Sequence, residues 1–233
     1  MYNFEATKDF IENIHDMKFM LEDIKKFEKR DSNNFDSIKS KILSNALFIL
    51  TMSSYENFIE KIFENFVNKL NDLKIKLPDK YYEQHIKTLI CKEKIEEKTE
   101  IKVDKIISKI YEYINIDLID KITLNHKFSF GRHGSNELNK LFKRLGIEDL
   151  CSKITIYSYR KDIIGNLNKD KINFKAKFDE MTSKRNNVLH EYSMPPLTSQ
   201  EITEYIRILG VFSRKLDILL HNELHILNTP PPT

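Results

Sequence analysis

Apolar residues recur at intervals of three and four over most of this chain, which is the spacing of one face of an α-helix. The 233 residues include only 5 Gly and 6 Pro, whereas a β-sandwich or β-barrel needs many turn residues. Hydrophobic residues make up 40% of the chain, which is enough for a core and too much for a disordered protein. We therefore predict an all-α fold, a helical bundle with long antiparallel helices.

The apolar pattern also predicts where the helices lie. Helices are expected at about 4–29, 36–72, 80–113, 174–192 and 199–226. A short helix is expected from near Ser135 to Gly146, which is placed as a helix-ending glycine. Thr198 followed three residues later by Glu201 indicates a capping box at the start of the last helix.

Two stretches are less regular. Residues 115–134 are the least helical part of the chain and are expected to hold a short strand or an ordered loop, and residues 150–172 are ambiguous. No linker divides the chain. We predict a single domain over 1–233 with a less regular central insertion at about 78–170.

Composition and charge exclude several classes of protein. The net charge is only +3, so any contact with nucleic acid must come from a local basic patch. Two cysteines cannot build a disulfide framework, and the N-terminus lacks the pattern of a signal peptide. The longest apolar stretch, around NALFILTM, is far shorter than the roughly 20 residues that span a bilayer. We expect a cytoplasmic protein with no membrane association.

The common cofactor motifs are missing. No glycine is followed by lysine, which excludes a P-loop, and neither G-x-G-x-x-G nor G-x-S-x-G occurs. His221 and His225 lie four residues apart and are a possible metal pair, but no third ligand is evident. The alternative is two solvated histidines near a helix end. We expect no metal and no cofactor.

One constellation near the C-terminus carries chemistry. Arg185 is followed by Asn186 and, five positions after the arginine, by His190. Arg185 also interrupts an apolar stripe formed by Phe174, Phe178, Met181, Val188 and Tyr192. At roughly 100° per residue, Arg185 and His190 lie about 140° apart around the helix axis and flank one edge, while Asn186 and His190 share a neighbouring face.

A matching interruption occurs in the second predicted helix. Glu56 stands in a stripe otherwise formed by Ile49, Met52, Ile59, Phe63 and Val67. Burying an unpaired charge is costly, so a carboxylate and a guanidinium on apolar stripes each need a partner. We predict that Glu56 pairs with Arg185 across the bundle. The alternative is that both stripes face solvent at these points.

A helical bundle whose last-but-one helix carries R-N-x-x-x-H resembles the HEPN superfamily (higher eukaryotes and prokaryotes nucleotide-binding). The likeness is closest to its RNase-type branch in bacterial toxin–antitoxin and phage-defence systems. The strings SSYENFIEKIF and GRHGSNELNKLFKRLGI are also similar to that branch. The family often has a small residue before the histidine and a glycine after it, where this chain has Leu189 and Glu191.

The resemblance implies a metal-independent endoribonuclease that leaves 2′,3′-cyclic phosphate and 5′-hydroxyl ends. His190 would move a proton, since imidazole titrates near neutral pH. Arg185 would hold the phosphate, and Asn186 would orient the imidazole or the phosphate. Glu56 would support the arginine, and Lys184 and Tyr192 would contact the RNA.

The resemblance also implies partners. Two protomers would pair as a homodimer with a composite active site, in a toxin or phage-defence effector controlled by an antitoxin or another defence component. Two alternatives stay open. The chain is either a HEPN-like module that binds RNA, nucleotide or a protein without cleaving, or a helical interaction protein whose arginine and histidine are accidental.

Overall fold

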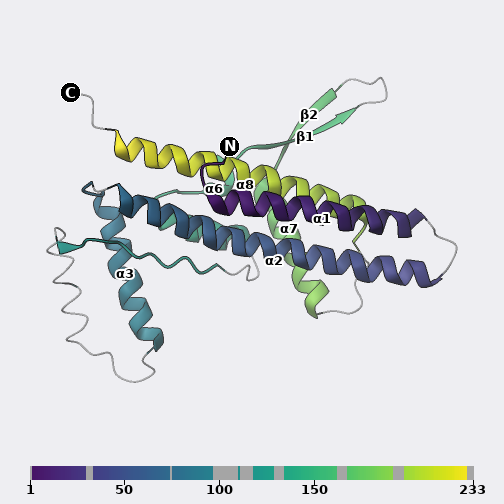
Figure 1. Ribbon diagram of the computed structural model, residues 1–233, viewed down its shortest axis with the longest axis horizontal. Helices are drawn as coiled ribbons and strands as arrows, with labels where there is room; N and C mark the ends of the chain where they lie inside the picture. The colour runs from purple at the N-terminus through teal and green to yellow at the C-terminus, as the bar shows by residue number, and fades with distance from the viewer. Residues whose placement is uncertain are drawn as a thin grey trace.

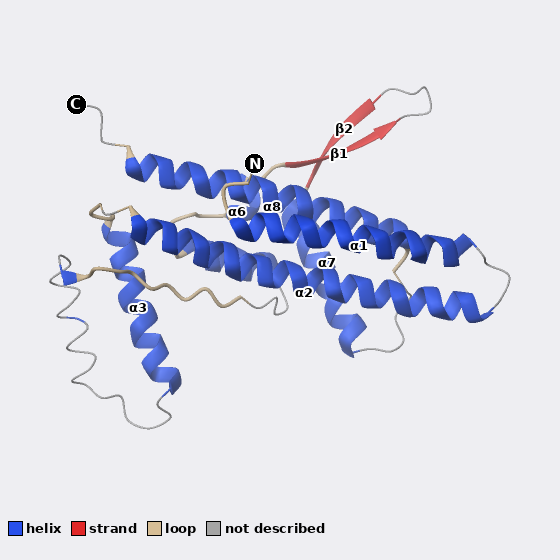
Figure 2. Ribbon diagram, viewed as in Figure 1, coloured by secondary structure: helices blue, strands red, loops and turns tan. Residues whose placement is uncertain are grey.

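The computed structural model describes residues 2–29, 34–73, 75–96, 110, 118–128, 134–161, 167–190 and 197–229. Within these residues it has seven helices and one two-stranded sheet (Figure 2). The predicted all-α class is confirmed, and the hairpin is a small addition to it.

Three long helices form the body of the molecule (Figure 1): α1 (Glu5–Lys29), α2 (Asn34–Asp72) and α8 (Ser199–Asn228). Each contacts the other two. One face of α1 is buried, formed by Ile14, Met17, Leu21 and Ile24. On α2 the buried face includes Leu47, Phe58, Ile62, Phe66 and Leu70, whereas Leu50 is exposed. Ser54 of α2 accepts a hydrogen bond from the Asn13 amide of α1 at 3.4 Å.

A buried carboxylate ties the start of α1 to the middle of α8. Asp217 is only 2% exposed, and it accepts hydrogen bonds from the backbone N–H groups of Asn3 and Phe4 at 3.0 and 2.9 Å. The Asn3 side-chain amide donates a third bond at 2.7 Å. These N–H groups lie directly before the first turn of α1, so the carboxylate fixes the chain at the helix start and its charge interacts favourably with the helix dipole.

Helix α3 (Asp79–Glu96) leaves the end of α2, so the predicted helix at 80–113 is confirmed over this range. Most of the remainder of that prediction lies outside the described residues. Beyond it, residues 118–128 run in an extended path beside α2 and α3 (Figure 2). Of the two alternatives for the 115–134 stretch, this described part is an ordered loop.

Side chains of the neighbouring helices hold that loop. The Asn71 amide exchanges two hydrogen bonds with the backbone of Ile122, at 2.9 and 3.0 Å. His85 accepts the N–H of Thr123 at 2.9 Å through Nδ1. Side chains thus satisfy these backbone groups in place of a neighbouring strand.

The central region continues with α5 (Gly134–Lys143) and α6 (Leu150–Lys153). Gly146 has a φ of 76°, and the N–H groups of Gly146 and Ile147 donate to the carbonyls of Lys143 and Phe142. This is the pattern of a Schellman motif, so the predicted helix-ending glycine is confirmed.

The ambiguous stretch at 150–172 contains an antiparallel β-hairpin after α6. Its strands are β1 (Ile156–Lys161) and β2 (Leu167–Ile172). The hairpin projects from the helical body (Figure 1).

Helix α7 (Phe174–His190) crosses behind α2 in Figure 1 and contacts α2, α5 and α6. The predicted helix is therefore confirmed as far as His190, and Tyr192 and the Pro195-Pro196 break lie outside the described residues. The predicted capping box of α8 is present, with Thr198 and Glu201 bonding reciprocally. No helix in the described ranges combines the length and the apolar content that crossing a bilayer requires.

We expect Asp217→Ala to lower the free energy of unfolding by about 2–3 kcal/mol, because it leaves partly buried donors at the start of α1 without an acceptor. Asp23→Ala on the exposed side of α1 is the control, and it is expected to cost less than about 0.5 kcal/mol. Urea unfolding followed by circular dichroism measures both. Equal losses in the two variants would show that the carboxylate does not anchor α1.

Candidate active site on helix α7

The first half of α7 is fixed by packing. Phe174, Phe178 and Met181 are buried, as their stripe predicts. On the next face, the Asp179 carboxylate accepts the N–H and the hydroxyl of Ser135 at the start of α5, at 3.0 and 2.8 Å. A side chain at Gly134 would collide with Thr182, so glycine allows the close approach of α5 to α7. The motif that follows therefore stands on a firmly placed helix.

Arg185 and Glu56 meet across the α2–α7 interface. Nη2 of the guanidinium lies 3.8 Å from Oε2 of the carboxylate, and the two side chains are 24% and 28% exposed. The ion pair predicted from the two interrupted stripes is thus present. Both side chains are therefore mostly buried, but each keeps a solvent-accessible part.

Burial raises the pKa of Glu56. The Arg185 guanidinium acts in the opposite direction, and the nearby Glu60 carboxylate raises this pKa further. Glu60 is itself bound by the backbone N–H of Phe128 at 2.9 Å and by Lys127 at 3.3 Å, so the loop before α5 packs beside this site. Arg185 therefore favours the ionised form of the Glu56 carboxylate, whereas burial and Glu60 favour the protonated form.

Asn186 lies directly beside the arginine. Its Oδ1 accepts a hydrogen bond from Nη1 of Arg185 at 3.2 Å. The spacing of four residues places Asn186 on the same helix face as His190. The amide is thus positioned between the guanidinium and the end of the helix.

His190 is the last residue of α7 and is exposed. Within the described part of the chain, no side chain or backbone group is hydrogen-bonded to its imidazole. The neighbouring Leu189 is 47% exposed. The imidazole is therefore accessible to a ligand, whereas the arginine of the same motif is held against α2.

Lys184 is held by protein groups on the side of α7 that faces α8. Its amine lies 2.7 Å from Glu201, 2.8 Å from the Tyr205 hydroxyl and 3.3 Å from Glu180. The Tyr205 hydroxyl donates to Glu180 at 2.7 Å. This cluster accounts for the Lys184 amine without a phosphate, so the expected RNA contact at this residue stays a prediction.

Charge balance in that cluster shifts several pKa values. Partial burial alone would lower the pKa of Lys184, but the bonds with Glu201 and Tyr205 outweigh it and raise that pKa. Burial would raise the pKa of Glu180, and the bonds from Tyr205 and Lys177 reverse this, so the pKa is lowered. The Lys184 amine and the carboxylates of Glu180 and Glu201 thus keep their charges at neutral pH, and with the neutral Tyr205 hydroxyl they join α7 to α8.

Sequence reasoning did not find this cluster. Glu180 and Lys184 are four residues apart, as are Glu201 and Tyr205, and such spacing indicates side chains on one helix face. That signal predicts pairs within a helix and does not predict which two helices meet. The other expected contact, Tyr192, lies outside the described residues.

The candidate metal pair lies near the C-terminal end of α8. His221 and His225 are both exposed on α8, and Thr229 lies 3.4 Å from Nδ1 of His225. Across the described residues, no group of three or more His, Cys, Asp or Glu side chains is placed to hold a metal ion.

Comparison with protein-family models identifies the family of this chain. The model of the RiboL-PSP-HEPN family matches residues 15–222, which include the Glu56 region of α2 and the whole of α7. This chain belongs to the RiboL-PSP-HEPN family. The resemblance to the HEPN superfamily is thereby confirmed. Searches of curated proteins and of solved structures found no match to the chain.

We expect the Glu56–Arg185 pair of this HEPN domain to show energetic coupling. In a double-mutant cycle of Glu56→Gln and Arg185→Met, the double variant is expected to differ from the sum of the singles by about 0.5–1.5 kcal/mol in the free energy of unfolding. The exposed Glu137–Lys140 pair on α5 is the matched control, expected to couple by at most about 0.5 kcal/mol. Additivity at both pairs would contradict a stabilising contact between α2 and α7.

Proposed function

We propose that this chain is a metal-independent endoribonuclease. The observation that supports this most directly is the contrast within α7: Arg185 is braced by Glu56 and Asn186, while His190 at the helix end is open to solvent. A braced cation can stabilise the charge on the phosphoryl oxygens, and an accessible imidazole can accept the proton of the 2′-hydroxyl during RNA transesterification. Membership in a HEPN family supports the same reading.

RNA carries its own nucleophile, the 2′-hydroxyl, so neither a covalent enzyme group nor a metal is needed. In the proposed step the 2′-oxygen attacks phosphorus and loses its proton to His190, which acts as the general base. The bond from phosphorus to the 5′-oxygen breaks, and that oxygen leaves with a proton. The products are a 2′,3′-cyclic phosphate and a 5′-hydroxyl.

Arg185 would stabilise the charge that develops on the phosphoryl oxygens. A guanidinium suits this role because its planar donors match two phosphoryl oxygens. Glu56 would hold the arginine through their ion pair, and Asn186 would orient the imidazole or the phosphate. In this proposal Lys184 acts through structure, since its bonds with Glu201 and Tyr205 fix the helix that carries the motif.

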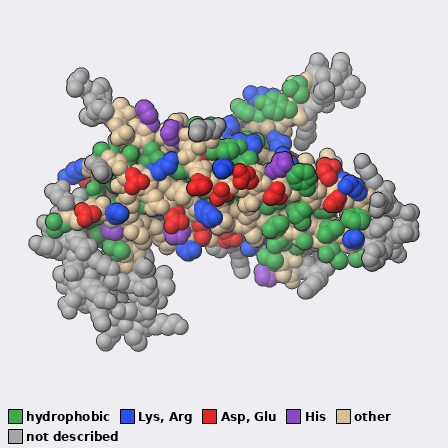
Figure 3. All heavy atoms as spheres, in the orientation of Figure 1, with side chains coloured by type: hydrophobic (Ala, Val, Ile, Leu, Met, Phe, Trp, Pro, Cys, Tyr) green, Lys and Arg blue, Asp and Glu red, His purple; other side chains and the backbone are tan. Residues whose placement is uncertain are grey.

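We also propose that two copies of the chain pair to complete the site, with the second copy supplying the acid for the leaving 5′-oxygen. Exposed apolar side chains recur at steps of four on the N-terminal half of α2, at Ile38, Ile42, Ala46 and Leu50. Figure 3 shows hydrophobic side chains gathered over this part of the molecule. In Figure 1 the C-terminal end of α7 emerges beside α2. Pairing of two copies through the exposed apolar residues of α2 would therefore bring the second copy close to the motif on α7.

Cellular RNA as substrate agrees with action in the cytoplasm as a toxin or phage-defence effector under the control of an antitoxin or another defence component. This part of the proposal rests on the family resemblance. A second candidate function is RNA or nucleotide binding without cleavage. Leu189 and Glu191 favour it, since the family often has a small residue before the histidine and a glycine after it.

Incubation of total RNA with the protein in excess EDTA tests the proposed activity. We expect cleavage by the wild type and a loss of at least about 100-fold in rate for His190→Ala, since a general base contributes 10²–10⁴-fold. His221→Ala, which removes another exposed histidine, is expected to cleave at the wild-type rate. Product ends are mapped with a phosphatase and a kinase that distinguish cyclic phosphates from monoesters.

The outcomes of that experiment separate the candidates. Equal cleavage by all three proteins would show that His190 is not the base. Binding of RNA without cleavage by the wild type would favour the non-cleaving module. Dependence on a divalent cation would contradict the proposed mechanism.

The paired state is tested by sedimentation. We expect the wild type to sediment as a dimer, and Ile42→Lys to sediment as a monomer with strongly reduced cleavage, because a buried lysine disrupts an apolar interface. Ile218→Lys, at an exposed isoleucine of α8, is expected to remain a dimer. A wild-type protein that is monomeric under the conditions in which it cleaves RNA would contradict a composite site.

A further inference from the structure

The β-hairpin has a fixed base and a free outer part. Ile156 at the start of β1 is buried, and Arg207 of α8 donates to the carbonyl of Tyr157 at 3.1 Å. Lys215 of α8 donates to the carbonyl of Thr155, just before β1, at 2.6 Å. From this anchored base the two strands extend away from the helical body (Figures 1 and 2). The hairpin is therefore an ordered projection, and its outer part adds little to the core.

The strand register places two tyrosines and two lysines on one face. Tyr157 is paired with Lys171 and Tyr159 with Lys169, and directly opposed residues of an antiparallel pair project to the same side. The Lys169 amine lies 4.0 Å from the centre of the Tyr157 ring. This contact is a cation–π interaction that holds the lysine over an aromatic ring. We call these four residues the hairpin face.

The hairpin face is open to solvent and carries positive charge. Tyr159 is 57% exposed, and both lysines are exposed. The acidic residue of β2, Asp170, is paired with Ser158 and therefore projects to the other side. Exposed aromatic rings interleaved with lysines suit a ligand with flat π-systems joined by anionic groups. Such a ligand is a single-stranded nucleic acid.

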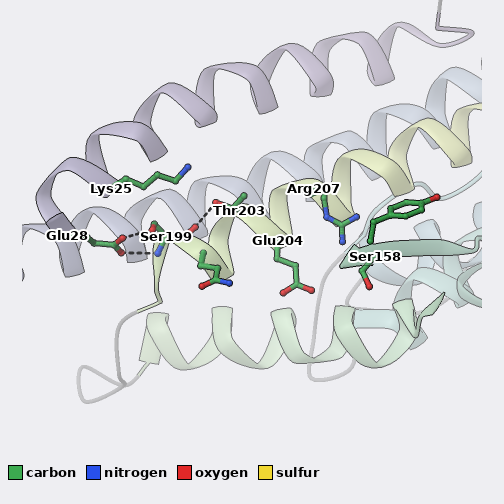
Figure 4. A pocket seen from close by; sticks show the side chains of 9 residues that line it. Lys25, Glu28, Ser158, Ser199, Thr203, Glu204 and Arg207 are labelled. Carbon is green, nitrogen blue, oxygen red and sulfur yellow. Dashed lines mark hydrogen bonds between the residues drawn. The ribbon is translucent and has the colours of Figure 1, made fainter. Parts of the chain in front are cut away.

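A groove of about 1030 Å³ lies between β1, α8 and the end of α1, and Tyr159 of the hairpin face lines it together with Ser158. Figure 4 shows Arg207 beside Ser158 at the hairpin end, with Thr203 and Ser199 further along α8. The groove also contains the carboxylate of Glu204. Carboxylates repel phosphate, so a nucleic-acid backbone is favoured on the lysines of the hairpin face and a base edge is favoured inside the groove.

We propose that the hairpin face is a binding site for single-stranded RNA, separate from the Arg185–His190 motif. In Figure 1 the hairpin and the end of α7 leave the helical body on opposite edges. As a substrate-holding surface it rests on the proposed endoribonuclease function. Because it lies away from the reacting phosphate, it raises affinity for RNA and leaves the chemical step unchanged.

Binding of a labelled 2′-O-methyl RNA 12-mer tests the site without any cleavage. We expect Tyr159→Ala to weaken binding about tenfold, since stacking contributes about 1–3 kcal/mol per base. Tyr159→Phe is expected to bind as the wild type does, because it keeps the ring. In the cleavage assay Tyr159→Ala is expected to raise KM by a similar factor with kcat unchanged.

The lysines are tested through the salt dependence of the same binding. Replacing Lys169 and Lys171 by glutamine is expected to reduce the slope of log affinity against log salt by about 1.4, at roughly 0.7 per phosphate contact on a single strand. Replacing the exposed α5 lysines Lys140 and Lys143 is the control of equal charge and is expected to leave the slope unchanged.

Unchanged affinity of Tyr159→Ala, or equal losses in the hairpin and α5 lysine variants, would overturn the proposed site. A duplex of the same sequence is expected to bind more weakly, because its bases are not free to stack. The probe cannot be cleaved, so these binding results would stand even if the protein proved not to cleave RNA. Conversely, if the hairpin face proved not to bind the probe, the proposed endoribonuclease activity would still stand on the cleavage assay.

Discussion

The meeting of Arg185 with Glu56 is the interaction on which the placement of the site depends. Each charge interrupts an apolar stripe, and neither is favourable at a helix interface without the other. Burial raises the pKa of Glu56 and the guanidinium opposes that rise, so each charge supports the other. The pair holds the Arg185 side of α7 against α2, and His190, which the five-residue spacing places about 140° around the helix axis from the arginine, is exposed.

Contacts on other faces of α7 reinforce that placement. Asp179 binds the start of α5, and the Lys184 cluster joins α7 to Glu201 and Tyr205 of α8. Glu201 serves twice, since it also completes the capping box of α8 with Thr198. The last turn of α7 is thus carried by a helix that is held on several sides, which is the arrangement that a precisely oriented catalytic group requires.

The long helices, the capping box and the helix-ending Gly146 were predictable because each rests on a local pattern of burial or backbone geometry. The Glu56–Arg185 pair was predictable for a related reason, since a charge within an apolar stripe indicates a missing partner. The capping of α1 by Asp217 was not, because a buried carboxylate more than 200 residues away leaves no periodic signal. The β2 strand was not predictable either, since its residues 167–171 are all exposed and show no alternation of apolar and polar residues.

The roles of individual residues were harder to predict than their positions. Lys184 stands next to Arg185, and its amine is bound by two carboxylates and a tyrosine hydroxyl, none of which was predicted; the expected contact with RNA stays a prediction. A sequence shows that a lysine is present and does not show which helix faces it. The aromatic and basic hairpin face was missed for the same reason, because it exists only in the register of two strands.

In the proposed reaction the RNA supplies its own nucleophile, while Arg185 and His190 assist. The most direct test is a synthetic RNA that contains one cleavage site and carries a single 2′-deoxy substitution on the 5′ side of the scissile phosphate. Without that hydroxyl no cyclic phosphate can form, so the substituted strand is expected to stay intact while the unmodified strand is cut. Cleavage of the substituted strand at the same phosphate would show that water or an enzyme group attacks the phosphorus, and would overturn the proposed mechanism.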